Sequence, residues 1–463
     1  MRLGLDRLWL ALALVLPALA SLIAPLPAVD LAYQVRAGAS ILAAGQIPVV
    51  DTFTFTVAGA SWVDQQWLAQ VVLAAGHALG GWELLAVLRA LLVAFAFGCV
   101  AGAAIARGAS ARAAAILSLA AFVVAAPALA LRPQLLGIAL FGSLLWIVAV
   151  RDRHPRLLVL APVVVALWAN VHGSVFLGPV LLGYAWLDDL VRGRPARPAL
   201  LALVAGTAAT LVNPFGAGVW WYAAGIGADP EITARVTEWQ RTSPLTVPGL
   251  LFYASAAGAA AVAWRGRASL RRPDWLWLAT LFVIGAWTER GLAWWPLGVA
   301  PLVAAALVTS GGPARVPRAA NRFNTVVAAV LAAAIVLALP WWRPAHPLTG
   351  RAGLLTYAPS GLALALREQA GPGSRVFAPQ PWASWLEWAV PDAVYYMDSR
   401  FELFPPQVWR DYDAIAQGRP GAQEALDRWA VNWLVVTAGE PGPVGWIEVY
   451  ADTDGAIFLR ATP

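Results

Sequence analysis

The sequence predicts a polytopic α-helical membrane protein with about eleven transmembrane helices and a small C-terminal α/β domain. Hydrophobic residues occupy 60% of the 463 positions and charged residues only 13%, whereas roughly 25% of an average soluble protein is charged. Apolar stretches of about 20 residues, the length that crosses a bilayer, recur as far as residue 341. Charged residues return after residue 343. The chain therefore divides into a transmembrane domain, 1–342, and an α/β domain, 343–463.

The same composition excludes several other classes of protein. So apolar a chain is not disordered, and its single cysteine, Cys99, lies inside an apolar stretch, so no disulfide can form within the chain. The net charge is +6, and every basic residue that contributes to it is an arginine, because the sequence contains no lysine. Most of these arginines lie in short loops between apolar stretches. This distribution is typical of membrane topology, and we expect no nucleic-acid partner.

The first apolar stretch, Leu8–Ala28, follows Arg2 and Arg7, which places the N-terminus in the cytoplasm. A cleaved signal peptide is the alternative, since Ala18-Leu19-Ala20 looks like a cleavage site. The apolar stretch continues past that point, which favours an uncleaved helix. Both interpretations place Asp30 on the far side of the membrane.

Arginine-rich loops alternate along the chain with loops that carry acids instead, as the positive-inside rule requires. The cytoplasmic ends of the predicted helices offer only Arg with Gly and Pro. The odd number of crossings places the C-terminal domain outside the cytoplasm. A lysine-free sequence is typical of a GC-rich bacterial genome, so we expect the bacterial inner membrane. The inner loops contain Arg107 and Arg112; Arg151, Arg153 and Arg156; Arg192, Arg194 and Arg197; Arg265, Arg267, Arg271 and Arg272; and Arg315, Arg318 and Arg322. After the first helix the crossings are Trp82–Ala106, two in Ala113–Val150, two in Leu157–Val191, a pair in Ala199–Trp264, a pair in Trp275–Val308, and Phe323–Trp341.

The C-terminal domain is expected to mix helices and strands, and its Asp454-Gly455 pair predicts a hairpin turn. It contains no nucleotide-binding fingerprint, which favours a domain that caps or docks over a second catalytic site. Helices are expected at 359–369 and 423–430, and strands at 374–378, 393–397, 431–436, 446–451 and 456–460.

The first outer loop, residues 29–66, carries the most chemical information. Leu31–Ala44 has the spacing of an amphipathic helix that lies along the membrane interface, with Arg36 able to face the lipid headgroups. Asp30 precedes this helix and Asp51 follows it. A carboxylate at the boundary of water and lipid is partly desolvated, which strengthens it as a base.

Polar residues also recur at the outer ends of the predicted helical hairpins. Arg132, His172 and the pair Glu289-Arg290 lie at such ends, and a second long outer loop, 217–249, joins Glu238 to a tryptophan. Polar groups so close to hydrocarbon are costly, so their repetition on one side predicts a chamber that opens outward. In it Asp30 and Asp51 are the acids, and Arg132, Arg290 and Arg36 bind an anion.

Each of these residues also has a plainer interpretation. Arg36 can be an ordinary snorkelling side chain, Arg132 and Arg290 can mark helix ends, and Asp51 can cap a turn. His172 can be a satisfied helix-end histidine, and no metal-ligand spacing accompanies it, so no metal or other cofactor is predicted. The loop 217–249 can either close over the first loop or rest on lipid.

The opening of the chain contains the motifs D-L-A-Y (30–33), G-Q-I-P-V-V-D (45–51) and W-V-D-Q-Q-W-L (62–68). In these motifs it resembles the opening of the GT-C superfamily of membrane glycosyltransferases. The nearest branch is that of protein O-mannosyltransferases, with the bacterial lipid A aminoarabinose transferases. Further blocks, which include E-W (238–239) and M-D-S-R-F-E (397–402), are similar to blocks of uncharacterised bacterial relatives.

The resemblance implies that Asp30 is the catalytic base and that the donor is a sugar on a polyprenyl phosphate or diphosphate. It adds Tyr33 and Asp64 to the candidate substrate-binding residues. The family often has an acid directly after the first Asp or a second acid in the next outer loop, whereas here Leu31 follows Asp30 and the next outer end offers Arg132. This departure favours a monophosphate donor held by arginine and leaves a divalent metal unsupported.

The sequence thus predicts an inverting glycosyltransferase at the outer face of the membrane, with a glycan, a lipid or a protein as acceptor. A transporter or flippase for an amphiphile is one alternative. It predicts polar groups at the midplane and an internal repeat, neither of which is evident. A non-catalytic assembly subunit that docks through its tail is the other, and it predicts that Asp30 can be replaced without consequence.

Overall fold

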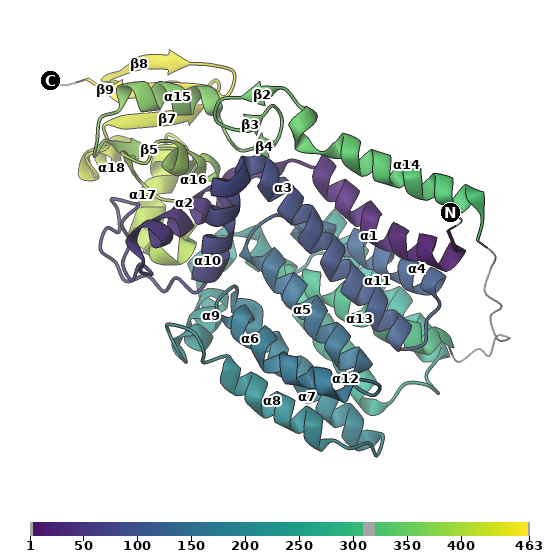
Figure 1. Ribbon diagram of the computed structural model, residues 1–463. Coiled ribbons are helices and arrows are strands. Elements are labelled where there is room, and N and C mark those ends of the chain that lie inside the picture. Colours follow the sequence, from purple (N-terminus) through teal and green to yellow (C-terminus); the bar gives the residue numbers. More distant parts are fainter. Residues whose placement is uncertain (1–2, 309–319, 462–463) are drawn as a thin grey trace. The chain divides into compact units, whose positions relative to one another are not determined.

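The computed structural model describes residues 3–308 and 320–461, which form two compact units (Figure 1). Unit 1 draws on Met1–Ala24 and Ala86–Trp342, and unit 2 on Pro25–Leu85 and Arg343–Pro463. The long helix α3 (Trp67–Ala106) leaves the helical conformation at Gly80 and Gly81 and runs from unit 2 into unit 1. The predicted inner arginines Arg2, Arg315 and Arg318 lie outside the described residues.

Unit 1 is helical, and the predicted fold class is confirmed. Seven of the described helical segments are long and apolar enough to cross a membrane, and three shorter apolar helices accompany them. Every predicted crossing contains a helix, while the number of eleven crossings stays a prediction. Besides α3, the helices of these stretches are α1 (Leu5–Ile23), α4 (Ala111–Ala125), α5 (Pro133–Val150), α6 (Ala161–Ala169), α7 (Leu177–Val191), α8 (Arg197–Ala209), α11 (Val247–Arg265), α12 (Arg272–Trp287), α13 (Trp294–Val308) and α14 (Arg322–Ala338).

Several of these helices begin where the sequence supplies a cap or a proline. Ser110 accepts a hydrogen bond from the backbone of Ala113 at the start of α4, and Thr246 caps α11 in the same way. Pro133 occupies the first turn of α5, where a missing N–H costs nothing. Helix α5 packs against both α6 and α7, and α12 packs against α13 (Figure 1).

A small residue on α5 sets the position of the segment between α6 and α7. A Cβ atom on Gly137 would lie 2.9 Å from Nε1 of Trp168 and 3.4 Å from Cβ of His172. Trp168 is fully buried, and its ring meets that of Phe141 on α5 in an edge-to-face contact. The missing side chain at residue 137 therefore lets this segment approach α5 closely.

The first helix ends earlier than the sequence predicted. Helix α1 stops at Ile23, because Ala24 is extended and Pro25 and Pro27 follow it. Helix α2 then runs from Ala28 to Ala44. Asp30 lies in the first turn of α2 and not at the exit of the first helix, so this part of the prediction was wrong. An acid is favourable there, near the positive end of the helix dipole.

Unit 2 joins the first outer loop to the C-terminal residues. Its five-stranded sheet has the order β6-β5-β7-β9-β8, in which β5 runs parallel to β6 and β7 while β9 runs antiparallel to β7 and β8. The strands are β5 (Arg375–Phe377), β6 (Val394–Tyr395), β7 (Trp433–Thr437), β8 (Trp446–Ala451) and β9 (Gly455–Arg460). Two further pairs are β1 (Leu26–Pro27) with β4 (Leu355–Thr356) and β2 (Ala345–His346) with β3 (Gly350–Arg351).

The helices of the C-terminal part include two that the sequence did not predict. The expected helices are α15 (Ser360–Gln369) and α18 (Ala422–Arg428), and the unexpected ones are α16 (Gln380–Ala389) and α17 (Pro406–Ala416). The expected hairpin joins β8 to β9, where the amide of Asp452 donates to the carbonyl oxygen of Gly455.

The first outer loop packs into the C-terminal part of unit 2. Residues 53–55 run along β6, since Tyr395 donates to the carbonyl oxygen of Phe53 and accepts from the amide of Phe55. Phe55 also packs against the buried cluster around Tyr396 and Phe458. The compact unit is thus larger than the predicted domain 343–463, because residues 25–85 belong to it.

Candidate functional site

Four of the predicted site residues come together in unit 1. We call Arg132, His172, Glu238 and Arg290 the arginine group. Arg132 is the residue before α5, and His172 precedes the 3₁₀ helix η3 (Gly173–Phe176). Glu238 lies in η4 (Thr237–Trp239), which belongs to the second long outer loop, and Arg290 lies in η5 (Glu289–Ala293).

Glu238 bridges the two arginines of the group. Its Oε1 atom lies 2.6 Å from Nη1 of Arg132, and its Oε2 atom lies 3.8 Å from Nη1 of Arg290. Burial alone would raise the pKa of Glu238, but the two guanidinium groups outweigh burial and lower it. Glu238 is therefore a carboxylate at neutral pH, and the two arginines already hold one anionic group.

His172 holds Arg290 from the other side. Its Nε2 atom lies 3.2 Å from Nη2 of Arg290, and its Nδ1 atom lies 2.7 Å from Oγ of Ser174. Burial, with Arg290 and Arg132 nearby, lowers the pKa of His172 well below its usual value. A guanidinium group can only donate hydrogen bonds, so the neutral ring accepts from Arg290. His172 thus orients Arg290 without adding charge.

The second outer loop is fastened to η5 next to Arg290. The amide of Glu289 donates to the carbonyl oxygen of Gln240 at 3.0 Å, and Thr246 donates to Oε1 of Glu289 at 3.3 Å. Gln134 donates to the carbonyl oxygen of Arg290 at 3.3 Å. The loop itself forms two short helices, α9 (Gly218–Ala228) and α10 (Pro230–Arg235).

Unit 2 contains the remaining predicted residues, and Asp30 has the C-terminal block 397–402 near it. Ser399 donates to the carbonyl oxygen of Val29, the residue before Asp30, at 2.8 Å. Tyr33 is buried on the same helix. Burial raises its pKa, and the carboxylates of Asp30, Glu402 and Asp398 raise it further. The charges of these three acids therefore all act on Tyr33.

Asp51 is occupied by its own loop and by an arginine. It accepts hydrogen bonds from the amides of Phe53 and Thr54 and from the hydroxyl of Thr54. Its Oδ1 atom lies 2.5 Å from Nη2 of Arg400, and the carboxylate is fully buried. These contacts match the interpretation of Asp51 as a turn cap.

Arg400 is the residue that the sequence offered without a role. Its guanidinium group also binds Asp398 at 2.5 Å and lies over the rings of Trp62 and Phe53. The only available signal was the block M-D-S-R-F-E, which contains Arg400 and one of its two partners, Asp398. Arg400 thus joins the C-terminal domain to the first outer loop inside unit 2.

Asp64 is an acid of the first outer loop whose pKa is strongly raised. Burial raises its pKa to about 7, against the hydrogen bond from Gln70 and the charge of Arg400. Nε2 of Gln70 donates to Oδ1 of Asp64 at 2.7 Å, while Oδ2 is buried without a hydrogen-bond partner among the described residues. A carboxyl group with this pKa can either give or take a proton at neutral pH.

Arg36 does not face the surroundings as predicted. It pairs with the buried carboxyl of Glu387 at 3.3 Å, donates to the carbonyl oxygen of Pro391 and lies over the ring of Phe53. Burial and the acids Asp398 and Asp51 raise the pKa of Glu387 to about 8, although Arg36 opposes them. Arg36 is thus held inside unit 2.

The residues at the predicted inner ends of the helices form ion pairs, which the sequence interpretation overlooked. Arg107 donates to Tyr184, and Tyr184 donates to Asp274, each at 2.6 Å. Arg151 binds both Asp188 and Asp189. The expectation that these ends offer only Arg with Gly and Pro was therefore wrong.

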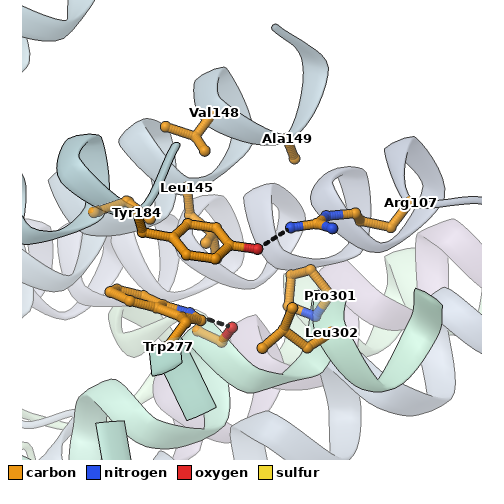
Figure 2. A pocket seen from close by; sticks show the side chains of 10 residues that line it. Arg107, Leu145, Val148, Ala149, Tyr184, Trp277, Pro301 and Leu302 are labelled. Carbon is orange, nitrogen blue, oxygen red and sulfur yellow. Dashed lines mark hydrogen bonds between the residues drawn. The ribbon is translucent and has the colours of Figure 1, made fainter. Parts of the chain in front are cut away.

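Beside this ion-pair network lies a small, mostly apolar pocket (Figure 2). Tyr184 and Trp277 form one wall, and Arg107 and Pro301 lie across from them. Trp277 donates to the carbonyl oxygen of Gly298. No predicted site residue lines the pocket. Among the described residues, no cluster of three or more His, Cys, Asp or Glu side chains is arranged to hold a metal ion.

Comparison with solved structures gives clear matches across the whole chain. ArnT from Cupriavidus metallidurans in the apo state aligns with a TM-score of 0.56 at 16% identity, and the match covers 99% of this chain and 98% of that one. The chain has the GT-C fold. ArnT bound to undecaprenyl phosphate matches with a TM-score of 0.51 at 17% identity, over 99% of both chains. No family model matches the sequence, and neither does any curated protein.

Two other enzymes share this fold. The oligosaccharyltransferase of Archaeoglobus fulgidus matches with a TM-score of 0.53 at 13% identity, over 92% of this chain and 69% of that one. The arabinofuranosyltransferase AftD from mycobacteria matches with a TM-score of 0.54 at 19% identity, over the whole of this chain and 42% of the larger enzyme. The fold and the apolar helices establish a multi-pass membrane protein. Because the sequence identities are below 20%, the likeness to these enzymes shows a shared fold alone.

Proposed function

We propose that the protein transfers a sugar from a polyprenyl-phosphate donor to a hydroxyl group of an acceptor at the outer face of a bacterial inner membrane. The observation that supports this most is the arginine group, in which two guanidinium groups hold one carboxylate. Two arginines that converge on one anionic group suit a phosphate equally well. ArnT, whose fold the chain shares, has been solved with undecaprenyl phosphate.

In the proposed reaction Asp30 is the base. It takes the proton from the acceptor hydroxyl as that oxygen attacks the anomeric carbon, and the bond between this carbon and the phosphate oxygen breaks with inversion. Arg132 and Arg290 then stabilise the negative charge that grows on the leaving polyprenyl phosphate, a type of term that is usually large. His172 keeps Arg290 oriented for this role.

The other predicted residues have supporting roles in the proposal. Tyr33 and Asp64 contact the acceptor, which is a glycan, a lipid or a protein. Asp51 contributes by holding the conformation of the loop that it caps, and Arg36 contributes through its ion pair with Glu387. Ser399, which binds the carbonyl oxygen before Asp30, positions the base.

The proposal is tested by the transfer of radiolabelled sugar from a polyprenyl-phosphate donor in membranes that contain Arg290→Gln. We expect at least a tenfold loss of transfer, since removal of one charged contact to the leaving group costs roughly 1.5–3 kcal/mol. Arg235→Gln is the matched control, because Arg235 pairs with Glu231 on the second outer loop, outside the arginine group. Equal transfer by the two variants would refute the proposed anion site.

A further inference from the structure

The arginine group already contains an anionic occupant, Glu238, and this has a consequence for ligand binding. From the geometry we infer that Glu238 is a built-in competitor: a phosphate group binds between Arg132 and Arg290 only by replacing the Glu238 carboxylate. The inference rests on the proposed function, since it assigns the route by which the phosphate reaches that same site.

The two arginines are held in place independently of Glu238. Nη2 of Arg132 donates to Oε1 of Gln134 at 3.2 Å, and Nη2 of Arg290 donates to Nε2 of His172. The Nη1 atom of each arginine reaches Glu238. The site therefore remains assembled when the carboxylate leaves.

The fit of Glu238 is uneven, which makes replacement favourable. One of its oxygens lies 2.6 Å from an arginine nitrogen and the other 3.8 Å, so only one contact has the length of a charge-assisted hydrogen bond. A phosphate group presents more oxygens in a tetrahedral arrangement and can satisfy both guanidinium groups at hydrogen-bond distance. The Glu238 side chain is also 36% exposed, so it reaches water without a large rearrangement.

Charge balance points the same way. The two arginines carry +2, Glu238 carries −1, and His172 is neutral because its pKa is lowered. A phosphomonoester, the product that the proposed transfer leaves on the polyprenol, carries about −1.5 to −2 at pH 7. With Glu238 in place such an anion would exceed the positive charge of the group, whereas without Glu238 it is matched. Return of the carboxylate then favours release of the product.

The experiment measures binding of a short-chain polyprenyl phosphate, presented in detergent micelles, to the purified full-length protein. Glu238→Gln is expected to bind about tenfold more tightly than wild type, the effect of losing one partly exposed charged competitor. Glu238→Asp, whose shorter side chain reaches less far, should bind with intermediate affinity. Glu231→Gln is the matched control, because Glu231 pairs with Arg235 on the same loop, and it should bind as wild type does. A parallel titration with inorganic phosphate tells whether the phosphate group alone suffices or the lipid is needed.

The outcomes separate the inference from the proposed function. If Arg132→Gln and Arg290→Gln weaken binding while Glu238→Gln and Glu238→Asp bind no more tightly than wild type, the anion site stands and the competitor role is refuted. If neither arginine variant weakens binding, the proposed function fails and the inference with it. Tighter binding by both Glu238 variants, together with weaker binding by the arginine variants, supports both.

Discussion

The ion pairs of Arg400 provide the sharpest test of how unit 2 is held together. Its guanidinium group lies 2.5 Å from both Asp51 and Asp398, and all three side chains are at most 1% exposed. Arg400→Gln leaves two carboxylates buried without a counter-ion. Removing one partner of a buried pair costs about 3–5 kcal/mol, so we expect the melting temperature of this unit to fall by roughly 6–20 °C, at about 2–4 °C per kcal/mol for a unit of this size.

Thermal unfolding of the full-length protein in detergent, followed by tryptophan fluorescence, measures this effect at pH 8. The expected loss arises because two buried carboxyl groups lack the guanidinium group that binds them both in the wild type.

The matched control is Arg410→Gln, since Arg410 is exposed and bonds only to the side chain of Gln407 among the contacts described for it. Such a surface change usually lies within about 0.5 kcal/mol of wild type. If Arg400→Gln melts within the range of this control at pH 8, then Arg400 does not compensate the two buried acids. The proposed stabilisation of unit 2 by these ion pairs would then be refuted.

Two further predictions concern Asp64 and Gly137. Because the pKa of folded Asp64 is raised to about 7, wild type loses stability as the pH rises from the unfolded pKa of about 4 through 7. Asp64→Asn should therefore melt higher than wild type at pH 8 and no higher at pH 4.5, and an equal difference at both values would contradict the assignment. Gly137→Ala places a methyl group 2.9 Å from Trp168, so it should destabilise unit 1 by about 1–3 kcal/mol and weaken binding of polyprenyl phosphate through His172. Gly258→Ala on α11, where nothing lies within 4 Å, is its control, and equal melting of the two variants would refute close packing at residue 137.

Local patterns predicted the elements of the fold well where each element depends on its own residues. The apolar stretches and the arginine-rich loops located the helices of unit 1, and alternating residues with Asp454-Gly455 located the hairpin of β8 and β9. The two helices that were missed both begin among prolines, at Pro379 and Pro381 for α16 and at Pro405 and Pro406 for α17. Prolines suggest a loop, yet they suit the first turn of a helix.

The contacts that define the candidate site were less predictable because they join distant parts of the chain. No local pattern indicated that Asp51 pairs with Arg400, 349 positions later, or that Glu238 bridges Arg132 and Arg290. The composition of the outer helix ends did predict that polar residues would gather, and it named all four members of the arginine group. Only the structure shows that Glu238 partly neutralises the two arginines and that Arg36 pairs with Glu387.

The central claim, that Asp30 is the base of a glycosyl transfer, is tested most directly by Asp30→Asn in a transfer assay with a radiolabelled polyprenyl-phosphate sugar. The asparagine keeps the size of the side chain and removes its basicity. We predict a loss of transfer of at least a hundredfold with binding of polyprenyl phosphate unchanged, while the exposed Asp392→Asn transfers as wild type does. Transfer by Asp30→Asn at the wild-type rate would contradict the account.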